Sequence, residues 1–264
     1  RKWNKDDIAT SILGFGCMRF TTKDGKIEEE KARKLLEEAY QEGINYFDTA
    51  MPYLGGQSEP FVGTVLNQFP RNSYFLATKF SIWDFKDIEE VENLIDEQLG
   101  YLKTDYIDFY LLHALNKDRL AKMKQHNVLG LVKKWQKQGK IRKIGFSFHD
   151  DYDVFSEILN MYPWDFCQIQ FNYMDKDVQQ GMQGYYDLLE KNIPIIVMEP
   201  LKGGRLSDFN PKVKEKLLQR SDDSLSKWAL RWVLSQRGII TALSGMNETA
   251  QLEENLEVCK NFKP

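Results

Sequence analysis

The chain has few cysteines, and their spacing excludes several classes of protein. Among 264 residues there are three, Cys17, Cys167 and Cys259, which form neither a Cys-x-x-Cys motif nor a repeated spacing. A zinc knuckle, an iron–sulfur cluster and a disulfide framework therefore lack support within this sequence. This cysteine usage is typical of a protein of the reducing cytoplasm, and we expect that location.

Long apolar runs and a strong charge imbalance are also missing. No apolar run approaches the roughly 18 residues that would suggest a membrane span. A formal net charge of -3 and a pI near 5.8 argue against a nucleic-acid partner bound through phosphate neutralisation. The first seven residues, Arg1 to Asp7, carry no apolar signal core, which removes the sequence argument for secretion.

Histidine is scarce as well, which weakens one functional hypothesis. A metal-dependent barrel hydrolase would need ligands from the three histidines, His113, His126 and His149. They form no His-x-His pair, and His126 lies in a charged stretch. We therefore predict no metal site.

What the sequence does contain is a regular alternation of β-rich runs and amphipathic segments. Strands are expected at Ile12 to Phe15, Tyr46 to Asp48, Tyr74 to Lys79, Tyr106 to Leu112, Ile141 to Phe146, Phe166 to Gln170, Ile193 to Met198 and Ile239 to Leu243. Helices are expected at Glu28 to Gln41, Ser58 to Gln68, Ile88 to Leu102, Val128 to Gln138, Tyr152 to Asn160, Gln183 to Lys191, from Ser224, and Glu248 to Val258.

Eight such units of about thirty residues predict an α/β protein with a closed (β/α)8 TIM barrel, residues 1–264 forming one domain. The competing fold is an open, doubly wound sheet. Against it, Gly14 to Arg19 after the first strand contains no Gly-x-Gly-x-x-Gly and leads into a charged loop instead of a helix.

Polar residues stand at the ends of three consecutive predicted strands. Asp48 ends the second strand and Tyr53 lies in the following loop, while Lys79 and His113 end the third and fourth. Taken singly, each has a plainer explanation: Asp48 as a turn cap, Tyr53 as packing, Lys79 as a snorkelling lysine and His113 as a core histidine. Together they predict an active site, because barrel active sites collect at the carboxyl ends of strands.

These four side chains are suited to proton transfer to a carbonyl oxygen. Lys79 would lower the pKa of Tyr53, which is ordinarily near 10, and Asp48 would hold Lys79 in place. A neutral imidazole of His113 would donate a hydrogen bond to the substrate oxygen. The missing component is a hydride source, which no side chain provides.

The sequence that contains these four residues resembles the aldo-keto reductase family. The motifs extend over nearly the whole chain: Leu13 to Arg19, Asn45 to Tyr53, Thr78-Lys79, Leu111 to His113, Ile141 to Ser147, Gln168 to Tyr173, Glu199 to Gly204 and Leu252 to Asn255. The resemblance implies a barrel that binds NADPH or NADH without a Rossmann domain and reduces aldehydes or ketones. It assigns the same roles to Asp48, Tyr53, Lys79 and His113.

The resemblance also implies a cofactor site. Its residues would be Met18, Arg19 and Asp48 near the strand ends, Ser147 and Gln168 at the carboxamide, Pro200, Leu201, Lys202, Gly203, Gly204 and Arg205 along the pyrophosphate, and Ser244, Gly245, Met246, Gln251, Glu254 and Asn255 at the adenosine. A common helix start is the alternative explanation for the last group. Because Gly245, Met246 and Gln251 replace frequent basic residues, no preference between NADP and NAD is predicted.

Other departures leave alternatives open. The tyrosine that often stacks on nicotinamide is replaced by Met198 or Glu199. The most similar subgroup often carries a ferredoxin-like extension, so the chain could be the reductase module of a larger iron–sulfur protein. A non-enzymatic, regulatory nicotinamide-binding barrel is a further alternative.

The substrate is predicted only as a small carbonyl compound. Trp83, Phe85 and a long loop from Ala114 to Asn127 are expected to line its pocket, although Trp83 could equally pack beneath a loop. The oligomeric state stays open, a monomer included.

Overall fold

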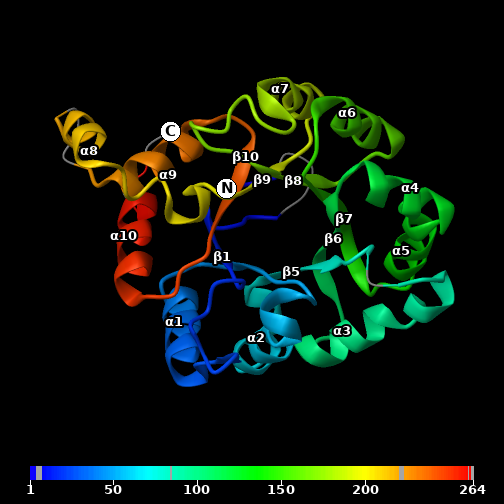
Figure 1. Ribbon diagram of the computed structural model, residues 1–264. Helices are drawn as coiled ribbons and strands as arrows, with labels where there is room; N and C mark the ends of the chain where they lie inside the picture. Colours follow the sequence, from blue (N-terminus) through cyan, green and yellow to red (C-terminus); the bar gives the residue numbers. More distant parts are fainter. Residues whose placement is uncertain (4–7, 84, 220–222, 261, 263–264) are drawn as a thin grey trace.

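The chain folds into a closed barrel of parallel strands surrounded by helices (Figure 1). The computed structural model describes residues 1–3, 8–83, 85–219, 223–260 and 262. Within these residues eight strands pair in the ring order β1, β10, β9, β8, β7, β6, β5, β4, which confirms the predicted (β/α)8 fold. The barrel strands are β1 (Leu13–Gly16), β4 (Tyr46–Asp48), β5 (Phe75–Phe80), β6 (Ile107–Leu115), β7 (Ile141–Phe148), β8 (Phe166–Gln170), β9 (Ile195–Met198) and β10 (Ile239–Ser244).

Helices cover the outside of the barrel, and one short hairpin precedes the first of them. The α-helices are α1 (Glu29–Gln41), α2 (Ser58–Leu66), α3 (Leu94–Leu102), α4 (Lys117–Gln125), α5 (Val128–Lys137), α6 (Tyr152–Met161), α7 (Gly181–Glu190), α8 (Pro211–Leu218), α9 (Leu225–Ser235) and α10 (Thr249–Lys260). Single 3-10 turns are η1 (Tyr53–Gly56), η2 (Arg71–Ser73), η3 (Ile88–Val91) and η4 (Lys202–Gly204), and the hairpin pairs β2 (Thr22–Lys23) with β3 (Lys26–Ile27). Among the described residues no helix is long and apolar enough to cross a membrane.

The structure corrects four element predictions. The expected loop from Ala114 to Asn127 contains helix α4, whose N-cap Asn116 accepts a hydrogen bond from the Arg119 amide at 2.9 Å. The helix expected from Ile88 is divided into η3 and α3. Strand β6 continues past Leu112, with a register shift before Leu115, so His113 lies inside the strand. Helix α8 also occupies part of the expected loop after β9.

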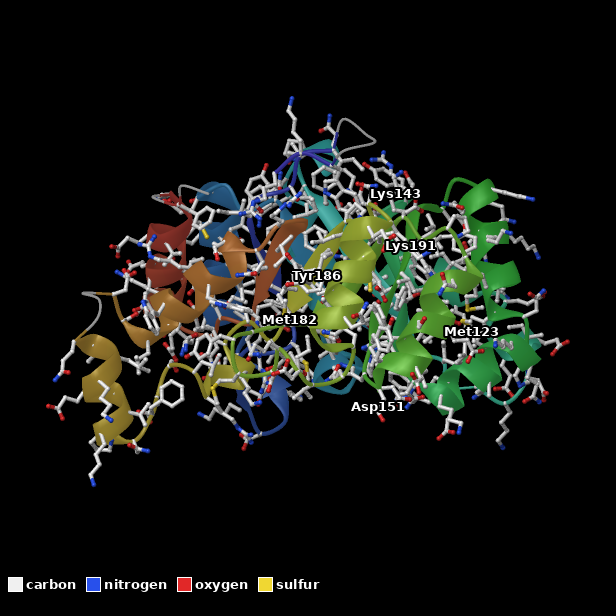
Figure 2. The ribbon with its side chains drawn as sticks, turned by 90° about the horizontal axis from the view of Figure 1, so that it is seen from above. Met123, Lys143, Asp151, Met182, Tyr186 and Lys191 are labelled. Atoms are coloured by element: carbon white, nitrogen blue, oxygen red, sulfur yellow. The ribbon has the colours of Figure 1, made fainter. Side chains whose placement is uncertain are left out.

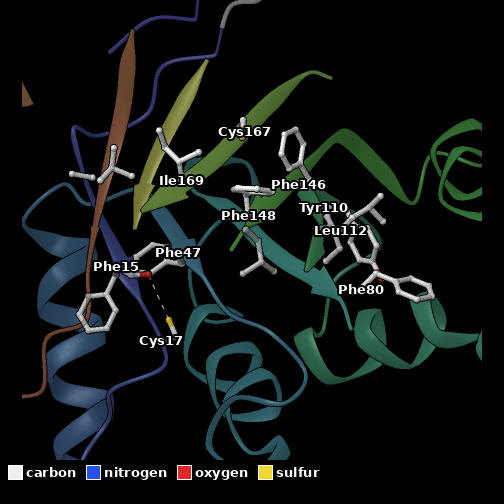
Figure 3. Packing of buried hydrophobic residues seen from close by; sticks show 14 of the residues in the cluster. Phe15, Cys17, Phe47, Phe80, Tyr110, Leu112, Phe146, Phe148, Cys167 and Ile169 are labelled. Atoms are coloured by element: carbon white, nitrogen blue, oxygen red, sulfur yellow. Dashed lines mark hydrogen bonds between the residues drawn. The ribbon is translucent and has the colours of Figure 1, made fainter. Parts of the chain in front are cut away.

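Two apolar layers hold the barrel together. The outer layer lies between strands and helices, and Figure 3 shows part of it, including Phe15, Phe47, Phe80 and Phe146. The inner layer fills the barrel. Trp3 closes its amino-terminal end by packing against Phe109, with ring centroids 4.8 Å apart. The barrel is therefore a packed core, and an active site is expected at its carboxyl-terminal mouth.

Candidate active site

The four predicted catalytic residues meet at the carboxyl-terminal end of the barrel. Asp48 is the last residue of β4, Lys79 lies in β5 and His113 in β6, three strands that are neighbours in the ring. Tyr53 opens η1, directly after β4. Because parallel strands end at one edge, residues far apart in the sequence share one site.

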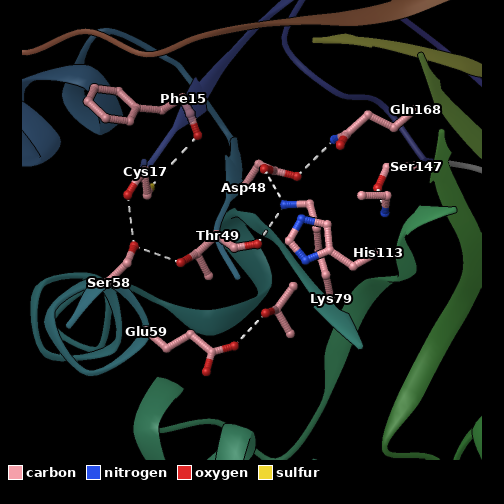
Figure 4. Close-up of polar contacts among 12 residues, drawn as sticks. Phe15, Cys17, Asp48, Thr49, Ser58, Glu59, Lys79, His113, Ser147 and Gln168 are labelled. Atoms are coloured by element: carbon pink, nitrogen blue, oxygen red, sulfur yellow. Dashed lines mark hydrogen bonds and ion pairs between the residues drawn. The ribbon is translucent and has the colours of Figure 1, made fainter. Parts of the chain in front are cut away.

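Lys79 and Asp48 form a buried ion pair (Figure 4). The ammonium donates to Asp48 Oδ1 at 2.6 Å and to the carbonyl oxygen of Thr49 at 2.7 Å. The other Asp48 oxygen accepts from the Gln168 amide at 3.0 Å. Side-chain exposure is 1% for Lys79 and 5% for Asp48, so the pair is held in a low-dielectric environment where its charges act strongly.

The Tyr53 ring lies against this ion pair. The Lys79 ammonium is 4.7 Å from the ring centroid, and the His113 ring is 5.8 Å away. Burial raises the pKa of Tyr53 above its ordinary value of 10.0, while the charge of Lys79 lowers it in smaller part. The charge of Lys79 acts in the predicted direction, but removal of the phenol from water outweighs it, so the pKa of Tyr53 is raised overall.

His113 is held neutral beside the tyrosine. Burial, followed by the charge of Lys79, places the pKa of His113 well below its ordinary value of 6.5. Its Nδ1 lies 3.4 Å from Ser81 Oγ. A neutral imidazole can donate one hydrogen bond to a carbonyl oxygen without carrying a charge of its own.

A second polar cluster, which was not predicted from the sequence, lies behind Lys79. Glu59 accepts hydrogen bonds from Thr78 Oγ1 and from Gln98 Nε2, and Gln98 also donates to the Lys79 carbonyl at 3.2 Å. The Tyr110 hydroxyl donates to Gln98 at 2.6 Å. Burial raises the pKa of Glu59. The adjacent Ser58-Glu59 pair resembled an ordinary helix start, so only the fold reveals this cluster.

Eleven of the predicted cofactor residues line one polar cavity of about 290 Å³, between η4 and the start of α10. They are Arg19, Pro200, Leu201, Gly203, Gly204, Ser244, Gly245, Met246, Gln251, Glu254 and Asn255. Gln251 Oε1 accepts from the Asn247 amide at 2.9 Å. The exposed backbone of Gly203 and Gly204, together with the guanidinium of Arg19, suits an anionic nucleotide. The volume of the cavity suits one part of a dinucleotide.

The other predicted cofactor residues lie outside this lining. Ser147 and Gln168 are buried at the catalytic end, where Ser147 Oγ accepts from the Ala114 amide at 2.7 Å. Met18 is exposed beside β1. Lys202 pairs with Asp175, and Arg205 is exposed. Their proposed cofactor contacts stay predictions.

The substrate wall is only partly as predicted. Trp83 contacts the His113 ring, with centroids 4.9 Å apart, which places it at the site. Phe85 is buried against Phe80 and lies within the packed layer rather than at a pocket surface. Helix α4 replaces most of the expected loop.

A cavity larger than the one beside α10 lies at the other end of the barrel. It measures about 590 Å³ and is lined by residues such as Trp164, Pro194, Lys143 and Lys191. Figure 2 shows Lys143 and Lys191 toward one end of the barrel and Asp151 toward the opposite end. Cavity size therefore does not locate the chemistry here.

No group of three or more potential metal ligands occurs among the described residues.

Comparison with known proteins agrees with this geometry. The model of the aldo/keto reductase family matches residues 12–264. L-Galactose dehydrogenase of Arabidopsis thaliana is 29% identical over 94% of this chain and 84% of its own length. NADH-specific methylglyoxal reductase of Escherichia coli is 27% identical over 95% and 90%. The holo structure of aldo-keto reductase AKR11C1 from Bacillus halodurans superposes with a TM-score of 0.82, at 26% identity, over all of this chain and 91% of its own.

Fold and site together define a barrel oxidoreductase. The chain belongs to the aldo/keto reductase family, and it is an NADPH- or NADH-dependent carbonyl reductase acting on small molecules. The enzymatic relatives favour catalysis over the alternative of a non-enzymatic, regulatory barrel.

Proposed function

We propose that Tyr53 donates the proton to the carbonyl oxygen of an aldehyde or ketone substrate. The observation that supports this role is the buried Asp48–Lys79 pair, whose ammonium lies 4.7 Å from the Tyr53 ring centroid. Lys79 keeps positive charge beside the phenol, which favours loss of its proton in the transition state. Asp48 maintains the position and the charge of Lys79.

His113 orients the substrate in this proposal. Its neutral imidazole donates a hydrogen bond to the same carbonyl oxygen and stabilises the negative charge that develops there. The bound nicotinamide cofactor supplies the hydride for the carbonyl carbon. Tyr53 supplies the proton for the oxygen, which completes the alcohol, and the phenolate is reprotonated from solvent.

The cofactor is proposed to extend from Ser147 and Gln168 to the cavity beside α10. Ser147 and Gln168 carry polar groups suited to a carboxamide, and the glycine-rich turn η4 suits a pyrophosphate. Arg19 provides positive charge at the cavity, although it lies 3.7 Å from Glu199.

The proposal also covers the domain organisation, the partners and the location of the protein. Residues 1–264 act as one catalytic domain, the carbonyl substrate is the relevant partner rather than a nucleic acid or a membrane, and the protein works in the cytoplasm. The composition described above supports these points. A reactive small aldehyde such as methylglyoxal is a reasonable first substrate, since one similar protein is a methylglyoxal reductase.

Fluorescence titration with NADH and with NADPH tests the cofactor site, and consumption of the bound cofactor on adding aldehydes, ketones or quinones tests the reaction. We expect micromolar or tighter binding of at least one cofactor, followed by turnover. Failure of both cofactors to bind at millimolar concentration would overturn the proposal.

A further inference from the structure

A half-buried arginine without a carboxylate partner lies next to the catalytic histidine. Arg119 Nη1 donates to the carbonyl oxygen of Ala114, the residue that follows His113, at 2.6 Å. Within the described part of the chain, no carboxylate oxygen lies within the 4.0 Å of an ion pair from its guanidinium. A cation in this environment is free to bind an anion.

The local backbone positions this guanidinium. Arg119 is in the first turn of α4, and its amide is bound by the N-cap Asn116. Ala114 has a φ of 50°, which L-residues rarely adopt, and this conformation follows His113 directly. The Ala114 amide donates to Ser147 while its carbonyl accepts from Arg119, so the peptide links the arginine to the active-site strands.

Trp83 joins the arginine to the catalytic residues. The guanidinium carbon lies 4.3 Å from the centroid of the Trp83 ring, and the same ring is 4.9 Å from that of His113. The His113 ring in turn is 5.8 Å from that of Tyr53. These contacts form a continuous row from the proposed proton donor to the unpaired cation. The charge of Arg119 also contributes to lowering the pKa of His113, after burial and Lys79.

We infer that Arg119 binds an anionic substituent of the substrate, a carboxylate or a phosphate, while the carbonyl oxygen contacts Tyr53 and His113. The substrate class is therefore aldehydes and ketones that carry an acidic group. Arginine has five N–H donors, of which Ala114 engages one, and its planar fork matches a carboxylate or phosphate. This inference rests on the proposed function, since it concerns the same site.

Matched acid and ester substrates test whether Arg119 binds an anionic substituent of the substrate. Succinic semialdehyde and 4-carboxybenzaldehyde are compared with their methyl esters, and 4-formylphenyl phosphate tests the phosphate arm. We expect wild-type kcat/KM to favour the acids over their esters. Arg119→Gln should lower kcat/KM for the acids about 10- to 100-fold, mainly through KM, because a charge-assisted hydrogen bond is lost. It should change the ester values less than about threefold, and Arg119→Lys should restore part of the loss.

Lys117→Gln is the matched control, because it removes an exposed cation from the same helical turn. It should leave the acid-to-ester ratio unchanged. Equal ratios in the wild type, Arg119→Gln and Lys117→Gln would overturn the inference. If Arg119→Gln does not fold, the wild-type ratio and the Arg119→Lys variant decide it. Absence of turnover on acids and esters alike would instead count against the proposed function.

Discussion

Replacing Lys79 with methionine should destabilise the protein far more than replacing a surface lysine. The methionine leaves Asp48 Oδ1 and the Thr49 carbonyl without their donor, in a site where Lys79 is 1% exposed. Removing one partner of a buried ion pair costs about 3–5 kcal/mol. Lys140→Met is the control, because Lys140 pairs with the half-exposed Asp96, and such surface pairs contribute about 0–1 kcal/mol.

A double-mutant cycle isolates the pair itself. Asp48→Asn keeps an acceptor for Lys79 and should cost less, about 1.5–3 kcal/mol. The double variant removes both charges, so it should be more stable than the sum of the singles by about 1–3 kcal/mol. Urea unfolding at pH 7 measures the four proteins of the cycle and the Lys140→Met control. Additivity within about 0.5 kcal/mol, or equal losses in Lys79→Met and Lys140→Met, would refute the reasoning.

Three further predictions concern pH and packing. The pKa of Tyr53 is raised above 10.0 and that of His113 lies well below 6.5. The pH profile of kcat/KM should therefore stay flat from about pH 6.5 to 9 and decline only at higher pH, where the proton donor ionises. An apparent pKa near 7 in that profile would contradict the prediction. Burial raises the pKa of Glu59 above 4.5, so the folded state binds the carboxyl proton more tightly than the unfolded state does. The stability of the wild type relative to Glu59→Gln should therefore improve as pH falls from 8 to 5. Denaturation curves in which the difference in unfolding free energy between the two proteins stays constant over this range would count against a buried carboxylate. Gly63→Ala should destabilise the protein by about 1–3 kcal/mol, since a Cβ at this position would lie 2.2 Å from the Tyr101 carbonyl oxygen. At Gly100 nothing lies within 4 Å of the added Cβ, so Gly100→Ala should stabilise helix α3 by about 0.5–1 kcal/mol. Equal shifts of the melting temperature in the two variants would contradict the packing argument.

The sequence was sufficient for the barrel because its signals are local and repeated. The predicted bounds of β4 and β8 match the structure, and both are short apolar or aromatic runs flanked by turns. Helix α4 escaped prediction because seven of its nine side chains are not buried; only Leu120 and Met123 face the core. Such a helix has almost no hydrophobic periodicity to detect.

The site was predictable only in part, for a related reason. Asp48 and Lys79 could be placed together because parallel strands share one end. The shift within β6 around His113 depends on pairing with β7, and the net pKa change of Tyr53 depends on burial. Arg119 contacts Trp83 and the carbonyl oxygen of Ala114, whose left-handed backbone carries no glycine signal in the sequence. These features belong to the assembled barrel rather than to any segment.

The most direct measurement of the central claim is a single-turnover rate and a cofactor affinity for Tyr53→Phe. The phenylalanine keeps the ring beside Lys79 and removes the hydroxyl proton. The account predicts that the rate of carbonyl reduction falls by about 10²–10⁴-fold while the Kd of NADH or NADPH changes less than about twofold. A near-normal rate in Tyr53→Phe would contradict the account and would make His113 the next candidate for the proton donor.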